Sequence, residues 1–411
     1  MKKNRVNMIS QIMIAVVLGV FFGLVFAELS KTLKVVGDIF LRLIQMSIPL
    51  LVSGQIIEAV ARLNPREVGA IGKKTIVIFA GSSLFAAIWG IVMALLLKPG
   101  SGVKIEGLSA GMTITEQSIS FHDTVLGFFP TNFIGALSEG AITQIIVFSL
   151  IFGVAFSLYR AEHQSSKLFD GLLELNEVII KLITLVMKVA PVGIFALIAS
   201  IIGQLGISVI LPLLKYLVIY GVATVSFLAI WIAVVSSTAK LNPFRLIKNM
   251  TGMSLMALAT TSSAITLPLA MQDSKEKLGL GDRVTKLVLP LGMSLNSNGS
   301  AMHMAITVVT IAQIYGLEYD FNKLMLTAVM ATLVSLANAV VPGAGLVSLA
   351  IIVPQMGLPI ESIALFASVE WFVGMLRTIL NVNSDVFTAV LVAKFENEID
   401  RNIFYQGASI N

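Results

Sequence analysis

The sequence predicts an all-α membrane protein with eight transmembrane helices and two re-entrant helical hairpins. Of its 411 residues, 56% are hydrophobic and 12% are charged, whereas soluble globular chains carry about 25% charged residues. Apolar runs of roughly 18 residues or more recur along the chain, and each is long enough to cross a hydrocarbon core of about 30 Å as a helix. The runs are continuous rather than alternating in polarity, which argues against a transmembrane β-barrel.

Eight apolar runs are predicted to span the membrane. They cover residues 8–27, 35–60, 75–97, 125–159, 171–202, 208–236, 284–315 and 361–394. Two further apolar segments, near 245–272 and 322–356, are broken by polar residues and prolines. The region 98–123 is polar and rich in glycine, and we expect an external loop there.

Lysine and arginine gather in the short connections between these spans and predict the orientation of the chain. The basic residues are Lys2, Lys3, Arg5, Arg62, Arg66, Lys73, Lys74, Arg160, Lys167, Lys240, Arg245, Lys248, Lys394 and Arg401. All fall on one side if the N-terminus is cytoplasmic. This holds only if each broken segment returns to the side from which it entered, so both are predicted to be re-entrant hairpins. We expect a multi-pass plasma-membrane protein within the lipid bilayer.

Other function classes are excluded by what the chain lacks. It has no cysteine, which rules out disulfides, thiolate catalysis and cysteine-bound metals. No A-x-A-like cleavage site follows the basic start, so the first span is expected to be retained. Neither HExxH nor GxSxG occurs, and we expect no enzymatic activity. The net charge of +5 reflects topology rather than binding to nucleic acid.

Two polar motifs lie within apolar surroundings. ATTSSAITLP (259–268) places four hydroxyls in a row in the first broken segment. Hydroxyls and free backbone N–H groups at a hairpin tip can receive a carboxylate, although an ordinary Ser/Thr turn is the alternative. SLNSNGSAMHM (294–304) interrupts the seventh span with oxygen-bearing side chains that suit Na⁺. Its alternative is hydrogen bonding between packed helices.

The second broken segment and the last span complete the pattern. Pro342, Gly343 and Gly345 predict a tight tip in the second hairpin, with a bent membrane helix as the alternative. Arg377, Asn381 and Asp385 form one stripe on a helix, with Thr378 beside it. Intramembrane charges are costly and mark functional sites. A direct Arg377–Asp385 salt bridge is ruled out by about 12 Å of helical rise.

Glu370 and His303 are two further ionisable residues within predicted spans. An acid–imidazole pair of this kind can carry a proton. A structural hydrogen bond for each is the interpretation that we favour from the sequence.

The motifs together resemble the glutamate-transporter family of dicarboxylate/amino acid:cation symporters along nearly the whole chain. FFPTNFIGALSEGAITQIIVFSLIFGVAF and MKVAPVGIFALIA resemble its fourth and fifth spans, and TSSAITLP and VPGAG resemble its two hairpin tips. NSNGS stands where the family has NMDGT, and RTILNVNSD where it has RTxxNVxGD. The resemblance implies a homotrimer with an elevator mechanism. Residues 1–74 and 98–204 would form its scaffold and external loop, and 75–97 and 205–411 its moving transport domain.

The resemblance also implies roles for residues. Arg377, with Ser300 nearby, would hold one substrate carboxylate. Thr378, Asn381 and the hairpin backbone at Ser262 and Ser263 would hold the other, with Gly345 at the second hairpin. One Na⁺ would bind carbonyls of Gly292, Asn296 and Asn381 and the Asp385 carboxylate. A second would bind near Ser294, Ser335, Leu336 and Asn338.

Two departures from the family pattern bear on substrate and coupling. Gly374 stands where members that carry amino acids have the aspartate that binds the ammonium group. Asn298 replaces an aspartate of a third sodium site, and Phe79, Ser82 and Ser83 stand for its tyrosine and Thr-Ser pair. We therefore expect a sodium-coupled importer of small anions that favours C4-dicarboxylates. We also expect the third sodium site to be lost, so that the coupling stoichiometry is either reduced or partly served by H⁺. The alternatives are an acidic amino acid symporter, with Glu370 or hairpin backbone binding the ammonium group, and an anion channel or non-transporting receptor.

Overall fold

The computed structural model describes residues 8–62, 65–101, 126–163, 166–205, 210–336 and 344–406. Regular structure within these ranges is helical, apart from one isolated antiparallel bridge between Leu280 and Ile399. Among the described residues, five helices are long and apolar enough to cross a membrane, or six if one bent pair counts as a span. The all-helical membrane class is therefore confirmed, while the count of eight spans stays a prediction. Most of the expected external loop 98–123 lies outside the described residues.

The N-terminal half and the middle of the chain supply one group of helices. They are α1 (Met8–Val25), α2 (Ala27–Thr32), α3 (Lys34–Gln45), α4 (Ile48–Ala61), α7 (Phe133–Glu139), α8 (Ile142–Glu162), α9 (Lys167–Lys188) and α10 (Ala190–Leu205). Glycine permits close packing here: a Cβ on Gly23 of α1 would lie 2.6 Å from the Ala199 carbonyl oxygen of α10. A Cβ on Gly153 of α8 would lie 2.8 Å from the Val60 Cβ of α4.

Three predicted spans are broken where the sequence suggested continuous helices. Span 35–60 divides between α3 and α4, and span 171–202 bends by 51° between α9 and α10. Each new helix carries proline in its first turn, Pro49 and Pro191, where the missing N–H costs nothing. Span 125–159 divides at Gly140, whose φ of +66° ends α7 in the left-handed conformation.

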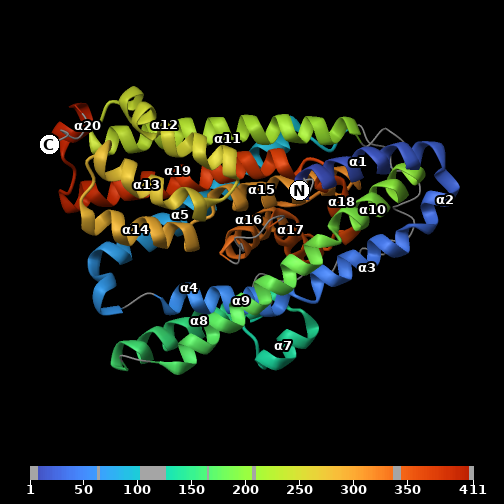
Figure 1. Ribbon diagram of the computed structural model, residues 1–411, viewed down its shortest axis with the longest axis horizontal. Helices are drawn as coiled ribbons and strands as arrows, with labels where there is room; N and C mark the ends of the chain where they lie inside the picture. The colour runs from blue at the N-terminus through green and yellow to red at the C-terminus, as the bar shows by residue number, and fades with distance from the viewer. Residues whose placement is uncertain are drawn as a thin grey trace, which may run out of the picture.

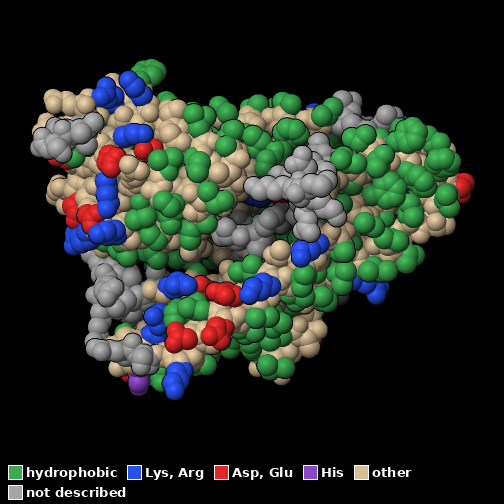
Figure 2. Space-filling view, in the orientation of Figure 1, with side chains coloured by type: hydrophobic (Ala, Val, Ile, Leu, Met, Phe, Trp, Pro, Cys, Tyr) green, Lys and Arg blue, Asp and Glu red, His purple; other side chains and the backbone are tan. Residues whose placement is uncertain are grey.

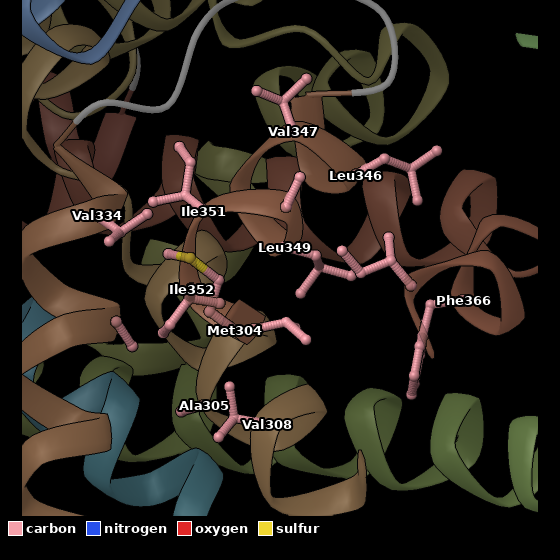
Figure 3. Packing of buried hydrophobic residues seen from close by; sticks show 14 of the residues in the cluster. Met304, Ala305, Val308, Val334, Leu346, Val347, Leu349, Ile351, Ile352 and Phe366 are labelled. Atoms are coloured by element: carbon pink, nitrogen blue, oxygen red, sulfur yellow. The ribbon is translucent and has the colours of Figure 1, made fainter. Parts of the chain in front are cut away.

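The second group of helices surrounds a buried centre. It comprises α5 (Pro65–Leu97), α11 (Ile210–Ala239), α12 (Pro243–Thr260), α13 (Ser263–Glu276), α14 (Asp282–Leu295), α15 (Asn298–Ile314), α16 (Phe321–Ser335), α17 (Ala344–Gln355), η3 (Ile360–Ser362), α18 (Ile363–Ala367), α19 (Glu370–Glu396) and α20 (Arg401–Gln406). Helix α15 packs against α5, α11, α16, α17 and α19 (Figure 1). Met304, Ala305 and Val308 of α15 lie in a cluster with residues of α16, α17 and α18 (Figure 3).

Both broken segments form helical hairpins. In the first, Asn249 Nδ2 in the second turn of α12 donates to the Lys277 carbonyl oxygen just after α13, at 2.7 Å. The turn between the two helices places Thr261 in the left-handed region at φ +50°. In the second, the Tyr319 hydroxyl before α16 donates to the Met356 carbonyl oxygen just after α17, at 3.0 Å. Its predicted tip residues, Pro342 and Gly343, lie outside the described part of the chain.

Charged side chains gather at the end of the molecule that carries α20 (Figure 2). Arg401 donates to the carbonyl oxygen of Ala239 at the end of α11. Lys74 of α5 pairs with Glu396 of α19 at 2.7 Å. Basic connections from distant parts of the sequence thus meet at one end, as the orientation argument requires. That this end faces the cytoplasm stays a prediction.

Candidate functional site

Helix α14 ends at Leu295 and α15 begins at Asn298, so two residues are non-helical in the middle of a buried pair of helices. Asn296 is extended at φ −118° and ψ 93°. A helix end leaves N–H and C=O groups without intrahelical partners. Buried inside the protein, these groups and the surrounding side chains can hold an ion or a carboxylate. The predicted break in the seventh span is confirmed.

Asp385 of α19 faces the end of α14. Its Oδ1 accepts a hydrogen bond from Asn296 Nδ2 at 2.8 Å. A Cβ on Gly292 would lie 2.5 Å from the Asp385 carboxyl carbon, so only glycine lets the carboxylate approach the last turn of α14 this closely. Three predicted cation ligands, Gly292, Asn296 and Asp385, therefore lie together. Carboxylate, amide and carbonyl oxygens are the ligands that hard cations prefer.

Asn381, one turn before Asp385, joins α19 to the start of α15. Its Oδ1 accepts from the Gly299 backbone N–H at 2.7 Å. A Cβ on Gly299 would lie 2.9 Å from the Arg377 Cα, so the two helices are in backbone contact there. The Asn381 side chain thus satisfies a free N–H of α15. Its proposed roles toward substrate and cation stay predictions.

The second predicted cation group is less well defined. The Ser294 hydroxyl donates to the Pro290 carbonyl oxygen at 3.4 Å, and the Ser335 hydroxyl donates to the Thr332 carbonyl oxygen at 2.7 Å. Both bonds lie within single helices. Leu336 is the C-cap residue that follows α16, and Asn338 lies outside the described residues. This grouping stays a prediction.

Arg377 is buried and forms an ion pair with Glu370 two turns earlier on α19, with 2.9 Å between Nη1 and Oε1. The two side chains are only 10% and 11% exposed. Gly345 in the first turn of α17 lies directly against both charged groups, where a Cβ would overlap Arg377 Nη1 and Glu370 Oε1. The hydrogen bond expected for Glu370 is confirmed, and Arg377 and Asp385 each have a partner other than one another.

Gly374 and Thr378 lie on either side of Arg377 in the chain. A Cβ on Gly374 would lie 3.7 Å from Arg377 Nη2, so the position that departs from the family pattern faces the guanidinium. The Thr378 hydroxyl donates to the Gly374 carbonyl oxygen at 2.8 Å. A substrate carboxylate at Arg377 would meet donors from the arginine fork and no carboxylate at position 374.

The tip of the first hairpin uses its hydroxyls locally. Ser262 caps α13, its Oγ accepting from the Ile265 N–H at 3.3 Å, and Ser263 is the first residue of that helix. Ser300 is buried in the first turn of α15. These predicted substrate residues all lie at helix N-termini, where N–H groups and the helix dipole favour an anion.

Asn298 forms a polar cluster with α5. Its Oδ1 accepts from the Ser83 hydroxyl at 2.7 Å and from the Ser82 hydroxyl at 3.3 Å. Phe79 is buried one turn earlier on α5. The positions that the resemblance assigned to a third cation site are therefore together. In this sequence the cluster contains an amide, two hydroxyls and a phenyl ring, and it carries no charge.

Comparison with known proteins decides the family. The model of the sodium:dicarboxylate symporter family matches residues 8–395. The proton/sodium-glutamate symport protein of Bacillus subtilis (strain 168) is 31% identical, over 96% of this chain and 94% of the relative. The proton/glutamate-aspartate symporter of Escherichia coli (strain K12) is 30% identical, over 98% and 95%. The C4-dicarboxylate transport protein of Bacillus subtilis (strain 168) is 28% identical, over 96% and 94%.

The chain belongs to the sodium:dicarboxylate symporter family. The resemblance inferred from the motifs is confirmed, and the family consists of transporters rather than enzymes.

Some contacts of this symporter were missed by the sequence interpretation. The Tyr220 hydroxyl of α11 donates to the Gly299 carbonyl oxygen at 3.0 Å, and the Ser254 hydroxyl of α12 donates to Asn383 Oδ1 at 2.8 Å. No sequence motif predicts either contact, because each one joins helices that are distant in sequence. The hydrogen bond expected for His303 is wrong: within the described structure neither ring nitrogen has a partner.

Proposed function

We propose that this chain is a cation-coupled symporter that imports C4-dicarboxylates. The observation that carries the proposal is the surroundings of Arg377, a buried guanidinium with glycine rather than a carboxylate at position 374. An ammonium-bearing substrate would lose a charge-assisted hydrogen bond there, worth about 1.5–3 kcal/mol. A dicarboxylate needs no such partner. A relative named as a C4-dicarboxylate transport protein supports this substrate class.

Acidic amino acids are the second candidate substrate class. Other relatives are named as glutamate or glutamate-aspartate symporters. Glu370 favours this alternative, since its carboxylate lies beside Arg377 and a substrate ammonium group could use it. Against it, Glu370 is already the partner of Arg377, and the guanidinium would have to release it.

The coupling ions in this proposal are Na⁺ and H⁺. Relatives are named for proton and sodium coupling, and the Gly292–Asn296–Asp385 group supplies one sodium site. The Asn298 cluster is neutral, so we propose that the third sodium site of the family pattern is lost and that coupling is reduced or partly served by protons. A stoichiometry of three sodium ions per substrate would disprove this part.

We also propose that transport occurs by an elevator mechanism. Residues 75–97 and 205–411 would move as a transport domain against a scaffold of residues 1–74 and 98–204, within a homotrimer in the plasma membrane, its N-terminus cytoplasmic. The two groups of helices in the fold support this division (Figure 1). The packing of α1 on α10 and of α4 on α8 gives the scaffold contacts of its own.

Uptake into proteoliposomes tests the function. Purified protein with an inward sodium gradient should accumulate radiolabelled succinate above the external concentration, and excess malate should compete better than aspartate. Equal competition by aspartate would favour the amino acid alternative. Succinate that only equilibrates across the membrane would indicate a channel, and binding without flux a receptor. Imposed Na⁺ and H⁺ gradients, varied separately, would give the coupling stoichiometry.

Gly374→Asp is expected to change substrate selectivity. The new carboxylate would lie beside Arg377 Nη2, repel a dicarboxylate and offer a partner to an ammonium group. We expect the ratio of aspartate to succinate affinity to rise by about ten- to a hundredfold, the equivalent of one charge-assisted bond. Binding competition at saturating Na⁺ measures this ratio. Gly374→Ala and Gly374→Asn are matched controls, and an equal rise in either would assign the effect to packing rather than charge.

A further inference from the structure

His303 lies in the second turn of α15 and has no role in the sites described above. Its side chain is 1% exposed, and neither Nδ1 nor Nε2 has a hydrogen-bond partner among the described residues. A neutral imidazole has one N–H donor and one lone-pair acceptor. Leaving both unpaired inside a protein destabilises the fold, so a group of this kind calls for an explanation.

Two tyrosines of α11 lie edge-on to the imidazole. The ring centroids of Tyr216 and Tyr220 lie 6.4 and 5.8 Å from that of His303. Their hydroxyls are engaged one turn to either side on α15: Tyr220 donates to the Gly299 carbonyl oxygen, and Tyr216 is 2.8 Å from Thr307 Oγ1. The tyrosines therefore hold the ring in place and leave both of its nitrogens free. This arrangement supplies rigidity without a hydrogen bond.

The charges that act on His303 come from α19. Helix α15 contacts α19 at Gly299, one turn before His303, where the backbone of Arg377 lies. Arg377 and its partner Glu370 are the ionised groups at this contact. Of the titratable groups of α11, Tyr216 and Tyr220 lie against His303. The third, Lys215, donates to the Lys98 carbonyl oxygen and the Ser101 hydroxyl at the exposed start of the helix. Other helices packed on α15 bring none close: α17 and α18 have no ionisable residue, and Lys323 of α16 is in its first turn. The ionisable residues of α5 all lie in its first three turns and are Arg66, Glu67, Lys73 and Lys74. The ionisable residues of α14 lie in its first two turns and are Asp282, Arg283 and Lys286.

Charge balance shows what this region needs once a substrate binds. Arg377 contributes one positive charge, and Glu370 and Asp385 contribute one negative charge each. A dicarboxylate adds two negative charges, so two sodium ions would still leave one negative charge uncompensated. Burying an unpaired charge is costly. One proton taken up with the substrate makes the loaded core neutral.

We propose that His303 binds this coupled proton: its imidazole is neutral without substrate and accepts one proton on a ring nitrogen when a dicarboxylate occupies Arg377. The inference rests on the proposed function. Without substrate, burial and the nearby guanidinium oppose a second positive charge. The bound dianion reverses this, and because the coupling is reciprocal, the proton strengthens dicarboxylate binding. Glu370 is the rival acceptor: its Oε1 accepts from Arg377 Nη1, but its Oε2, like both nitrogens of His303, is buried without a hydrogen-bond partner among the described residues. The ion pair with Arg377 favours the charged form of Glu370, which is why we assign the proton to His303.

Proton uptake on binding tests the inference. Succinate titrations by calorimetry at about pH 7 and saturating Na⁺, in two buffers of different ionisation enthalpy, count the protons taken up per succinate. We expect about one for the wild type and none for His303→Gln, which should still bind succinate. Succinate affinity should rise up to about tenfold per unit fall in pH in the wild type and stay flat in the variant. His163→Gln, which removes an exposed histidine stacked on Tyr159, is the matched control and should behave as the wild type.

The outcomes separate this inference from the function on which it rests. If the wild type does not bind succinate, the proposed function fails and this inference fails with it. If succinate binds without proton uptake, only the inference is overturned. Uptake that persists in His303→Gln and disappears in Glu370→Gln would assign the proton to Glu370 and overturn it as well.

A second measurement needs no substitution at His303. The chain has three histidines, so His122→Gln/His163→Gln leaves His303 as the only one. Its ¹⁵N imidazole signals should report a neutral ring without succinate and a protonated ring with it, at the same pH. An imidazole that keeps one protonation state throughout would overturn the proposal, even if His303→Gln fails to fold.

Discussion

Arg377→Gln is expected to weaken succinate binding by at least about 30-fold, the equivalent of the 2 kcal/mol or more that loss of one partner from a buried, hydrogen-bonded charge pair typically costs. Arg377 is the buried cation that faces position 374 and contacts the first turn of α17, so a substrate carboxylate there depends on its fork of donors. Arg377→Lys keeps the charge but loses the planar fork, and should fall between glutamine and the wild type.

Folding must be separated from binding in this experiment. Arg377→Gln leaves the Glu370 carboxylate buried without its partner, and part of its effect will be loss of stability. The double variant Glu370→Gln/Arg377→Gln removes both charges. We expect it to recover a thermal midpoint near that of the wild type, while succinate no longer raises that midpoint. A ligand that binds the native state raises apparent stability by mass action, so thermal shift reads both quantities. Succinate binding by the double variant at wild-type strength would show that Arg377 does not hold the substrate.

The residues proposed for this site could be picked out from the sequence because polar groups at membrane depth are energetically costly. Arg377 and Asp385 stand out in an apolar span, and a charge there survives only when it is buried in protein and used. The helix break at Asn296 could also be predicted from the sequence. Asparagine and serine side chains compete for backbone hydrogen bonds and glycine weakens a helix, so several of them together in an apolar span indicate an interruption. The free-energy cost of placing a polar or charged group at membrane depth depends on residue type and local spacing, and a single sequence gives both.

Pairings between helices could not be predicted in the same way. That Asn381 bonds the Gly299 N–H, or that Asn296 bonds Asp385, depends on the axial register of α14, α15 and α19, which local sequence does not determine. For Glu370 the sequence predicted a structural hydrogen bond but not that Arg377 is its partner. The two residues are two helical turns apart, and the ion pair depends on the length of the arginine side chain. For His303 the sequence interpretation predicted a hydrogen bond that the described structure does not contain.

The bends in the first group of helices had a signal that the hydropathy pattern concealed. Pro49 and Pro191 each fall within a long apolar run, and each begins a new helix in the structure. Proline is favoured in the first turn of a helix, where its missing N–H costs nothing, so these two positions were candidate helix starts. Proline alone does not decide a break, because Pro268 and Pro290 lie inside α13 and α14. Gly140 acts similarly at the end of α7. A continuous run of apolar residues gives the length available for a span, and helix-breaking residues decide how that length is divided.

Asp385→Asn is expected to remove most of the dependence of succinate binding on Na⁺. Asp385 is the one carboxylate in the Gly292–Asn296–Asp385 group, and asparagine has nearly the same shape without the charge. Loss of even an outer-shell partner of a bound metal commonly costs about 10- to 100-fold in affinity, so loss of the only charged ligand should raise the sodium concentration for half-maximal binding by at least that much. Succinate titrations at a series of sodium concentrations measure the shift.

The stability of the Asp385→Asn variant, compared in potassium and in sodium buffer, is an independent test of the same sodium site. Without Na⁺, the wild type buries the Asp385 carboxylate with a neutral amide as its partner, whereas the variant buries no charge at this position. The variant should therefore be at least as stable as the wild type in potassium buffer and less stable at high sodium, where only the wild type gains from ion binding. Asp282→Asn is the matched control: it removes an acidic residue from the exposed start of α14, where ion pairs with Lys275 and Lys286 contribute little. It should keep the sodium dependence of the wild type. An Asp385→Asn protein that is stabilised by sodium as strongly as the wild type would place the cation elsewhere.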